Sequence, residues 1–412
     1  MTSTRPNPTR LSAIDSFFVA YQESSGVLMQ LGVEVELKGR LARSGVERML
    51  EHIVRRWPPL GQRLRQELFG LSWAGECRTN DMLALADGRE SLAEWRNRPI
   101  DPFVEPPFQL LWIAEGDTNV LAFRAHHAVV DGEGFFAVCV EAMRTLVSLE
   151  TTDFTDGQAT LRELSLGKAF RNLQELRRSQ PSARLAMRDC SPGETSIVER
   201  DVPRDASGWL CASAWMRAIH AWNESRGAAS TSVISIEVPV SLRRRRDGGI
   251  RTGNWISPLT LYGDATHPLE ALAADLKQQM SRAMRQRMHL ALPLLSSPAK
   301  SLPWPVFRKL ATNPELTGVA TSHFAWFEQS RTIHDDVFRH SGGALQIVDQ
   351  RIYTPVCLHM GAAMSVLAWP ERAQMFITHR LTALSTDDAN VLADLAVREL
   401  GQRYLSRQQV AV

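Results

Sequence analysis

A strand that runs into a histidine pair, an Asp-Gly pair and then a helix constrains this chain more than any other feature. The segment reads Ala125-His126-His127-Ala128-Val129-Val130-Asp131-Gly132. Residues 120–125 have the apolar pattern of a strand, and residues 134–149 carry apolar side chains at helical spacing. Neighbouring residues at a strand end point to opposite faces, so one imidazole can face a cavity while the other packs inward.

The residue types in this segment suit proton transfer. A neutral histidine is the side chain best placed to accept a proton near neutral pH. Asp131 is close enough in sequence to brace the loop, and Gly132 permits a backbone turn that a Cβ would resist. Two interpretations stay open, a catalytic base and a structural histidine pair. We expect no metal site, because the two rings diverge and no HExxH or ligand cluster accompanies them.

Strands and helices occur along the whole chain, which predicts an α/β fold. Helices are expected at 11–24, 41–57, 134–149, 207–226, 268–289 and 385–400, and strands at 28–37, 109–113, 120–125, 232–240, 317–327, 344–353 and 363–369. The charged stretch 167–204, interrupted by Pro181, Pro192 and Pro203, predicts the join between two halves.

Composition excludes several other classes. The 412 residues include 47 Lys and Arg against 45 Asp and Glu, a net charge of +2 that gives no support for nucleic-acid binding. Five scattered cysteines without a CxxC pair suit a reducing compartment. The polar start is no signal peptide, and no apolar stretch is long enough for a membrane span. We therefore expect a soluble, cytoplasmic protein and a monomer.

The motif His126-His127-x-x-x-Asp131-Gly132 resembles the HHxxxDG signature of the chloramphenicol acetyltransferase-like acyltransferase superfamily. That superfamily includes condensation domains, wax ester synthase/diacylglycerol acyltransferases and polyketide-associated acyltransferases. Three further blocks resemble family elements in the family's order: 57–64 (WPPLGQRL), 99–111 (PIDPFVEPPFQLL), and 238–243 (VPVSLR) with Gly253-Asn254. The DFGWG element of the plant branch is missing, so the chain does not resemble that branch.

The resemblance implies an architecture and a mechanism. The expected fold is two chloramphenicol acetyltransferase-like halves, 1–175 with HHxxxDG and 176–412 with PVSLR…GN. Each half is a mixed sheet with helices, and the two form a V around a central tunnel. His127 is the implied general base, supported by His126, and no acyl-enzyme forms. Asp131 is implied to pair with Arg243 and to hold the loop. No cofactor is bound; acyl-coenzyme A or an acyl-phosphopantetheine carrier is the co-substrate.

Other positions are expected to contribute to the tunnel. Ser322 and Asn254 are candidate tunnel or oxyanion groups, although His323 stands where relatives often have Asn. The oxyanion group is left open among the Ser322 hydroxyl, an indole and a backbone N–H. Trp255 and Trp326 are candidates to line the tunnel. We expect the remaining histidines, 323, 334 and 340, to be structural.

An arginine run follows the PVSLR block. Arg244 and Arg245 either lie in a solvated loop or grip the phosphates of coenzyme A or of a phosphopantetheine arm, because guanidinium suits bidentate phosphate contact.

The leading functional hypothesis is a stand-alone acyltransferase that moves an acyl group from a thioester to a hydroxyl or amine, with PVSLR…GN favouring ester formation. An alternative is a free-standing condensation enzyme that joins carrier-bound substrates in nonribosomal peptide or polyketide biosynthesis. A non-enzymatic recruitment module of the same fold is the third hypothesis.

Overall fold

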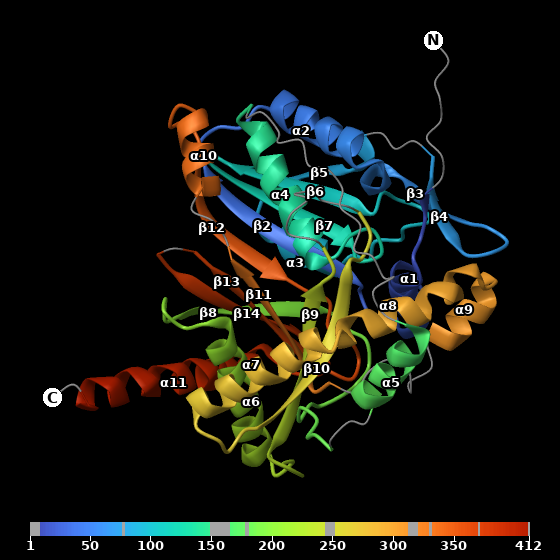
Figure 1. Ribbon diagram of the computed structural model, residues 1–412. Coiled ribbons are helices and arrows are strands. Elements are labelled where there is room, and N and C mark those ends of the chain that lie inside the picture. Colours follow the sequence, from blue (N-terminus) through green and yellow to red (C-terminus); the bar gives the residue numbers. More distant parts are fainter. Residues whose placement is uncertain are drawn as a thin grey trace.

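The computed structural model contains two mixed β-sheets, each covered by helices, and one small sheet (Figure 1). The structure describes residues 9–75, 79–148, 165–177, 181–243, 252–311, 320–328, 332–369 and 371–410.

The first sheet has the strand order β12-β2-β7-β6-β5. Its neighbours are antiparallel except for the parallel pair β6–β5. The strands are β2 (Gln30–Lys38), β5 (Leu83–Ala86), β6 (Phe108–Glu115), β7 (Thr118–His126) and β12 (Gln346–Tyr353). The expected hairpin between 109–113 and 120–125 is present as β6 and β7, which pair from Phe108↔Ala125 to Glu115↔Thr118.

Helices cover both faces of the first sheet. Helices α2 (Arg43–Arg56) and α4 (Gly132–Leu146) pack on one face, where Leu121, Phe123 and Ala125 of β7 enter the main core. Helix α3 (Ser91–Asn97) covers the other face. Because side chains alternate along β7, successive residues near its end point to opposite faces of the sheet.

The second sheet has the order β10-β9-β11-β13-β14-β8. Strand β11 is parallel to both of its neighbours, and the other pairs are antiparallel. The strands are β8 (Thr195–Val202), β9 (Val233–Ser241), β10 (Ile256–Asp264), β11 (Ser322–Glu328), β13 (Ala362–Ala368) and β14 (Ala373–Arg380). The helices α6 (Gly208–Ser225), α7 (Leu269–Arg285) and α11 (Thr386–Val410) cover its outer face (Figure 1).

The remaining elements lie beside the two sheets. The small sheet is β1 (Thr9–Arg10), β4 (Leu71–Ala74) and β3 (Arg63–Gln66). The remaining helices are α1 (Ala13–Ser25), α5 (Leu166–Arg177), α8 (Ala291–Ser296), α9 (Trp304–Ala311) and α10 (Thr332–His340), and the 3-10 turns are η1 (Pro58–Gly61), η2 (Thr79–Asp81), η4 (Met288–Leu290) and η5 (Ser297–Ser301).

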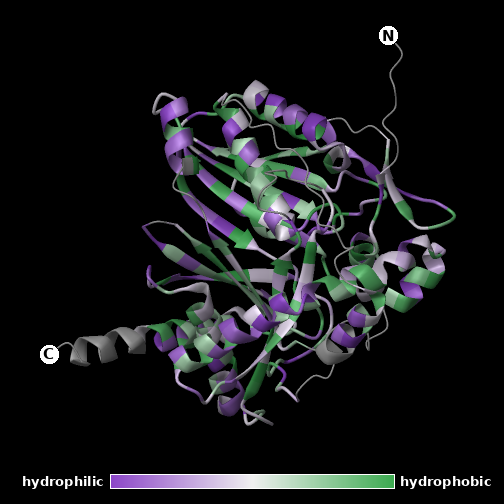
Figure 2. Ribbon diagram, viewed as in Figure 1, coloured by the Kyte–Doolittle hydropathy of each residue, from purple (hydrophilic) through white to green (hydrophobic). Residues whose placement is uncertain are grey.

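The inner face of the second sheet packs on the first half of the molecule. Leu367 and Phe376 belong to the same buried cluster as Phe123 of β7. Strand β12, although it is late in the sequence, pairs with β2 from Gln346↔Lys38 to Tyr353↔Gly32. Hydrophobic residues concentrate between the sheets and their helices (Figure 2). The two sheets therefore share one core.

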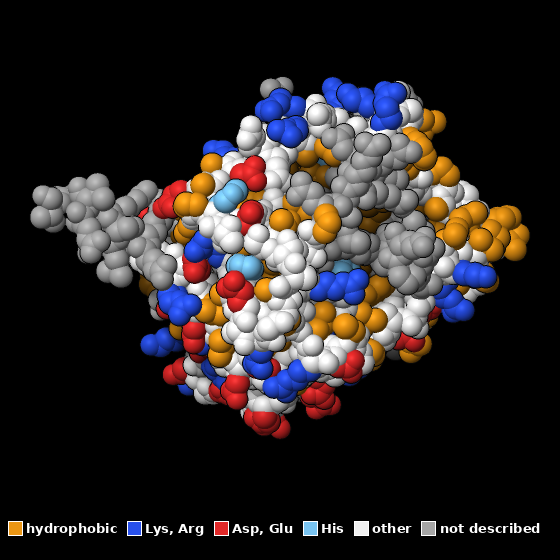
Figure 3. All heavy atoms as spheres, turned by 90° about the horizontal axis from the view of Figure 1, so that it is seen from below, with side chains coloured by type: hydrophobic (Ala, Val, Ile, Leu, Met, Phe, Trp, Pro, Cys, Tyr) orange, Lys and Arg blue, Asp and Glu red, His pale blue; other side chains and the backbone are white. Residues whose placement is uncertain are grey.

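The predicted fold class is confirmed: the chain has two mixed sheets with helices. The central tunnel stays an expectation. The stretch 167–204, in which we expected the join, contains most of α5 and all of β8. Within the described residues, no helix combines the length and the apolarity needed to cross a bilayer. Viewed from below, Lys and Arg are interspersed with Asp and Glu, and hydrophobic side chains gather at the right-hand end (Figure 3).

Candidate active site

His127 directly follows β7 and is held by an extension of the sheet. Its backbone N–H donates to the carbonyl oxygen of Met29 at 2.7 Å. Its ring stacks on Phe18 of α1, with centroids 3.9 Å apart and planes 11° apart. The residue is 7 % exposed, and Nδ1 is buried with no hydrogen-bond partner in the described structure.

Burial sets the basicity of His127. Burial is the largest cause of the low pKa of the imidazole, which is about 4; nearby His323 also lowers the pKa, while contact with its own backbone and the Asp131 charge raise it. The ring is consequently neutral at pH 7 and able to accept a proton.

His126 occupies a different environment. It is fully buried, and its Nδ1 accepts the backbone N–H of Ala128 at 3.1 Å. An accepting Nδ1 carries no proton, so the neutral ring is protonated on Nε2. Burial lowers the pKa of His126 to about 3. The two histidines therefore diverge as strand alternation predicts, and His126 supports the loop from inside.

The carboxylate of Asp131 ties the loop to the second sheet. Asp131 is the N-cap of α4 and accepts the Gly134 N–H at 2.8 Å. Its two oxygens also accept hydrogen bonds from Nη1 of Arg243, at 2.8 and 2.7 Å. Oδ2 accepts another from the Trp255 backbone N–H at 2.7 Å. Asp131 is fully buried, and the Arg243 side chain is 14 % exposed. The pair implied by the sequence resemblance is present.

Asn254 braces the loop from a second direction. Its Nδ2 donates to the His127 carbonyl oxygen at 2.6 Å and to Asp15 Oδ1 at 2.8 Å. Asp15 also accepts the Asn254 backbone N–H and completes the capping box of α1 with Ser12. Burial raises the pKa of the Asp15 carboxyl. Asn254 thus positions His127 through the backbone and joins it to α1.

The expectation for Gly132 is wrong. Gly132 is the first residue of α4 with no positive φ, and a Cβ there would meet Phe327 Cζ only at 3.4 Å, an ordinary contact. The crowded glycine is Gly134, where a Cβ would lie 2.8 Å from both Arg243 Nη2 and Val130 Cγ2. The helix begins two residues earlier than the apolar pattern indicated, so the tight approach at Gly134 falls inside it.

Ser322 does not face His127. Its hydroxyl accepts Nε1–H of Trp215 on α6 at 2.9 Å and donates to the Ala362 carbonyl oxygen at 2.7 Å. It therefore belongs to the outer face of the second sheet, which removes it as an oxyanion donor.

The two candidate tunnel tryptophans lie in different parts of the second half. Trp326 lies on the same outer face, against Gly208 at the start of α6. The Trp255 side chain joins the cluster around Leu242 and Leu290. Its contribution to the site is the backbone N–H that it donates to Asp131.

His323, which we expected to be structural, lies on the opposite face of β11 from Ser322. It is paired in register with Glu237 of β9. Its Nδ1 lies 3.6 Å from Glu237 Oε1, and the side chains are 19 % and 27 % exposed. The signal in the sequence was alternation: in β11, Ser322 and His323 must take opposite faces.

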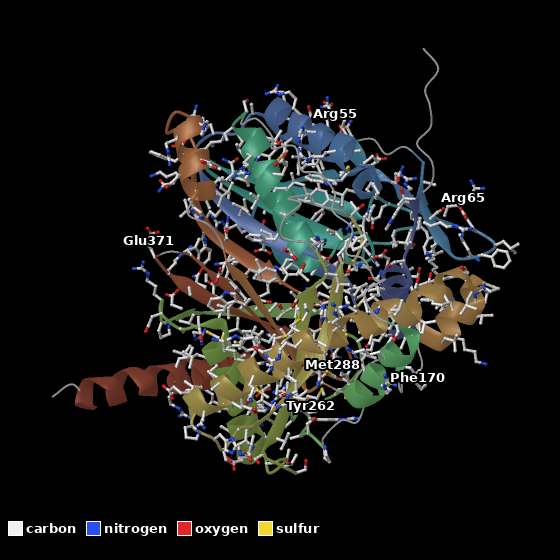
Figure 4. All side chains as sticks on the ribbon, viewed as in Figure 1. Arg55, Arg65, Phe170, Tyr262, Met288 and Glu371 are labelled. Atoms are coloured by element: carbon white, nitrogen blue, oxygen red, sulfur yellow. The ribbon has the colours of Figure 1, made fainter. Side chains whose placement is uncertain are left out.

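Arg244 and Arg245 lie outside the described residues. Of the described arginines, Arg55 of α2 and Arg65 of β3 are exposed and point outwards from the molecule (Figure 4).

Proteins similar to this chain are found by structure and not by sequence. No protein-family model and no curated protein matches the sequence. The condensation domain from Monacolin K polyketide synthase MokA is similar, with a TM-score of 0.72, 12% identity, and 97% and 98% of the two chains covered.

Two further condensation domains match over nearly their whole length. A mutant starter condensation domain of rhizomide synthetase RzmA in complex with C8-CoA has a TM-score of 0.71 at 13% identity, covering 95% of this chain and 94% of that one. The first condensation domain of the calcium-dependent antibiotic synthetase in complex with substrate analogue 3a has a TM-score of 0.69 at 14% identity, with 97% of each chain covered. With its two mixed sheets and covering helices, the chain has the fold of these condensation domains.

Proposed function

We propose that this protein is an acyltransferase that moves an acyl group from a thioester to a hydroxyl or amine acceptor, with His127 as general base. The observation that carries the proposal is the way the imidazole is held. His127 is stacked on Phe18, its backbone is tied to Met29 and Asn254, and its Nδ1 is buried, so we assign the substrate to the other ring nitrogen, Nε2. A base fixed in this way contributes by orientation as well as by proton transfer.

The reaction needs no covalent enzyme intermediate. Nε2 of His127 removes the proton from the acceptor O–H or N–H as that oxygen or nitrogen attacks the thioester carbonyl carbon. The tetrahedral intermediate collapses, the C–S bond breaks, and the proton on Nε2 passes to the leaving thiolate. The low pKa of His127 suits the second step, because its protonated form is a strong proton donor.

We propose coenzyme A or an acyl-phosphopantetheine carrier as the source of the acyl group. Support comes from the neighbour with C8-CoA bound, the RzmA starter condensation domain. We also propose a reducing, cytoplasmic compartment, because the described cysteines Cys139, Cys190, Cys211 and Cys357 are free. The division into halves at residue 175 belongs to the same proposal, although β12 pairs into the first sheet.

Release of free thiol tests the proposal. The protein is incubated with C8-CoA and a panel of amines and alcohols, and coenzyme A release and acylated product are measured together with the intact mass of the protein. We expect acceptor-dependent release with equal product and no mass increase. Release without product, or an acylated protein, would contradict the mechanism, and no release from any donor would favour a recruitment module.

A second candidate is condensation of two carrier-bound substrates. It is favoured by the nearly complete overlap with three condensation domains. The same acyl group offered on coenzyme A and on a carrier protein separates the two candidates. A large preference for the carrier in kcat/KM supports the condensation enzyme, and comparable values support the coenzyme A enzyme.

A further inference from the structure

The second sheet presents an acidic residue and a histidine on its inner face. Ile236 and Ser322, which form the neighbouring register pair, point into the outer core beside α6. Because side chains alternate, Glu237 and His323 point to the opposite face. Both are partly exposed, unlike the fully buried pair next to them. The sheet therefore carries a polar pair at a place where hydrophobic core residues do not bury its inner face.

That inner face runs beside the His127 loop. Phe327, four residues beyond His323 on the same side of β11, lies 3.4 Å from the Cβ position of Gly132 and packs on Phe136 of α4. His323 is itself close enough to His127 for its charge to act on that ring. The pair thus belongs to the sheet that packs beside the His127 loop, and His323 lies within range of an electrostatic effect on the His127 ring.

The charge of the pair is not cancelled by a strong cation. Among the described residues, Glu237 has His323 as its ion-pair partner, and no lysine or arginine nitrogen lies within 4.0 Å of its carboxylate. Arg380, which lies near this end of the sheet, donates instead to the carbonyl oxygens of Ser191 and Leu358. A partly exposed carboxylate in such surroundings attracts a positively charged hydrogen-bond donor.

We propose that Glu237 and His323 form the acceptor-binding site opposite His127 and that they select an acceptor whose nucleophile is an amine. This deepens the proposed function and rests on it. The Glu237 carboxylate holds the protonated amine. The ammonium gives one proton to the His323 imidazole, which becomes an imidazolium stabilised by Glu237, and the resulting neutral amine attacks the thioester. His127 then removes the second proton. A hydroxyl acceptor brings no charge and needs no first deprotonation, so the pair discriminates between the two.

Binding to a variant without the proposed base tests the site independently of turnover. The probes are Leu-SNAC, an amine that is bound together with C8-CoA in a mutant RzmA starter condensation domain, and its 2-hydroxy analogue. Calorimetry compares His127→Ala with His127→Ala/Glu237→Gln. We expect the second variant to bind Leu-SNAC about tenfold more weakly, because it loses a hydrogen bond between charged groups, and to bind the hydroxy analogue unchanged. The matched control is His127→Ala/Glu199→Gln, which changes a half-exposed ion pair on β8.

Turnover supplies the second readout. With C8-CoA as donor, Glu237→Gln should raise KM for Leu-SNAC about tenfold and leave that for the hydroxy analogue unchanged. His323→Gln should lower kcat for the amine alone. Equal effects on both probes, or no binding of Leu-SNAC to His127→Ala, would overturn the acceptor site. Selective binding without any acyl transfer would instead overturn the proposed reaction and leave the amine site standing.

Discussion

At the scale of single residues, two adjacent histidines have opposite surroundings. The imidazole of His126 lies inside the sheet and accepts a backbone N–H through Nδ1. The imidazole of His127 stacks on Phe18, and its buried Nδ1 has no hydrogen-bond partner in the described structure. His126 is the last residue of β7 and His127 follows it, and this shift of one position separates a structural side chain from a candidate base, because the alternation of faces continues past the strand end.

The depressed pKa of His127 predicts an unusual pH profile. A folded-state pKa of about 4, below the ordinary 6.5, means that the ring stays neutral as the pH falls through 6.5 and becomes charged only near pH 4. With a hydroxyl acceptor, which does not ionise in this range, kcat/KM should be flat from about pH 8 to about pH 5. Initial rates in buffers of constant ionic strength measure this. A fall in activity centred near pH 6.5 would show that the base has an ordinary pKa.

At the scale of elements, local patterns predicted the strongly periodic segments well. The helix expected at 11–24 is α1, and the strand expected at 28–37 is β2. Strand β10 was missed because Pro258 and Gly263 interrupt its pattern, and its place at the sheet edge explains why a proline is tolerated there.

The candidate site also has a part that the sequence predicts and a part that it does not. The HHxxxDG loop is contiguous, so its strand–loop–helix setting follows from sequence. The Glu237–His323 pair depends on a parallel register between β9 and β11, which are far apart in the chain, and no local pattern specifies such a register. The side of β11 that Ser322 occupies could not be told for the same reason.

Substitution of two glycines of α4 by alanine should have opposite effects on stability. Gly134→Ala places a Cβ 2.8 Å from Arg243 and Val130, so the free energy of unfolding should fall by about 1–3 kcal/mol. Gly132→Ala meets only an ordinary contact and restricts the unfolded chain, so stability should stay equal or rise by about 0.4–1 kcal/mol. Urea denaturation of both variants measures the difference. Equal losses in the two would mean that the helix starts in a different position.

At the scale of the whole molecule, the two sheets are joined at several places around the candidate site. Strand β12 pairs with β2, the inner face of the second sheet shares the main core, and Asp131 binds Arg243. Asp15 of α1 binds Asn254, which lies in the chain between β9 and β10 of the second sheet. The position of His127 therefore depends on the packing of the whole chain.

Removal of the buried Asp131 carboxylate, which binds Arg243, should destabilise the entire fold. Asp131→Ala removes the buried carboxylate that binds Arg243 and the Trp255 N–H and leaves Arg243 with the more exposed Glu133 carboxylate at 3.5 Å, so the free energy of unfolding should fall by about 3–5 kcal/mol. The control is Glu47→Ala, which removes the exposed pair with Arg43 and should cost about 0.3–0.5 kcal/mol. Chemical denaturation of the two variants compares them, and similar losses would show that the Asp131 link is not a structural one.

Acyl transfer by a folded His127→Ala variant tests the central claim most directly. Coenzyme A release and product formation from C8-CoA are measured beside wild type and a His267→Ala control, which changes an exposed histidine. Thermal unfolding must first show that all three proteins are equally folded. We predict that His127→Ala loses about 10²–10⁴ of the wild-type rate, the contribution of a general base, while His267→Ala keeps it. A His127→Ala protein that turns over at nearly the wild-type rate would contradict the assignment of His127 as the base.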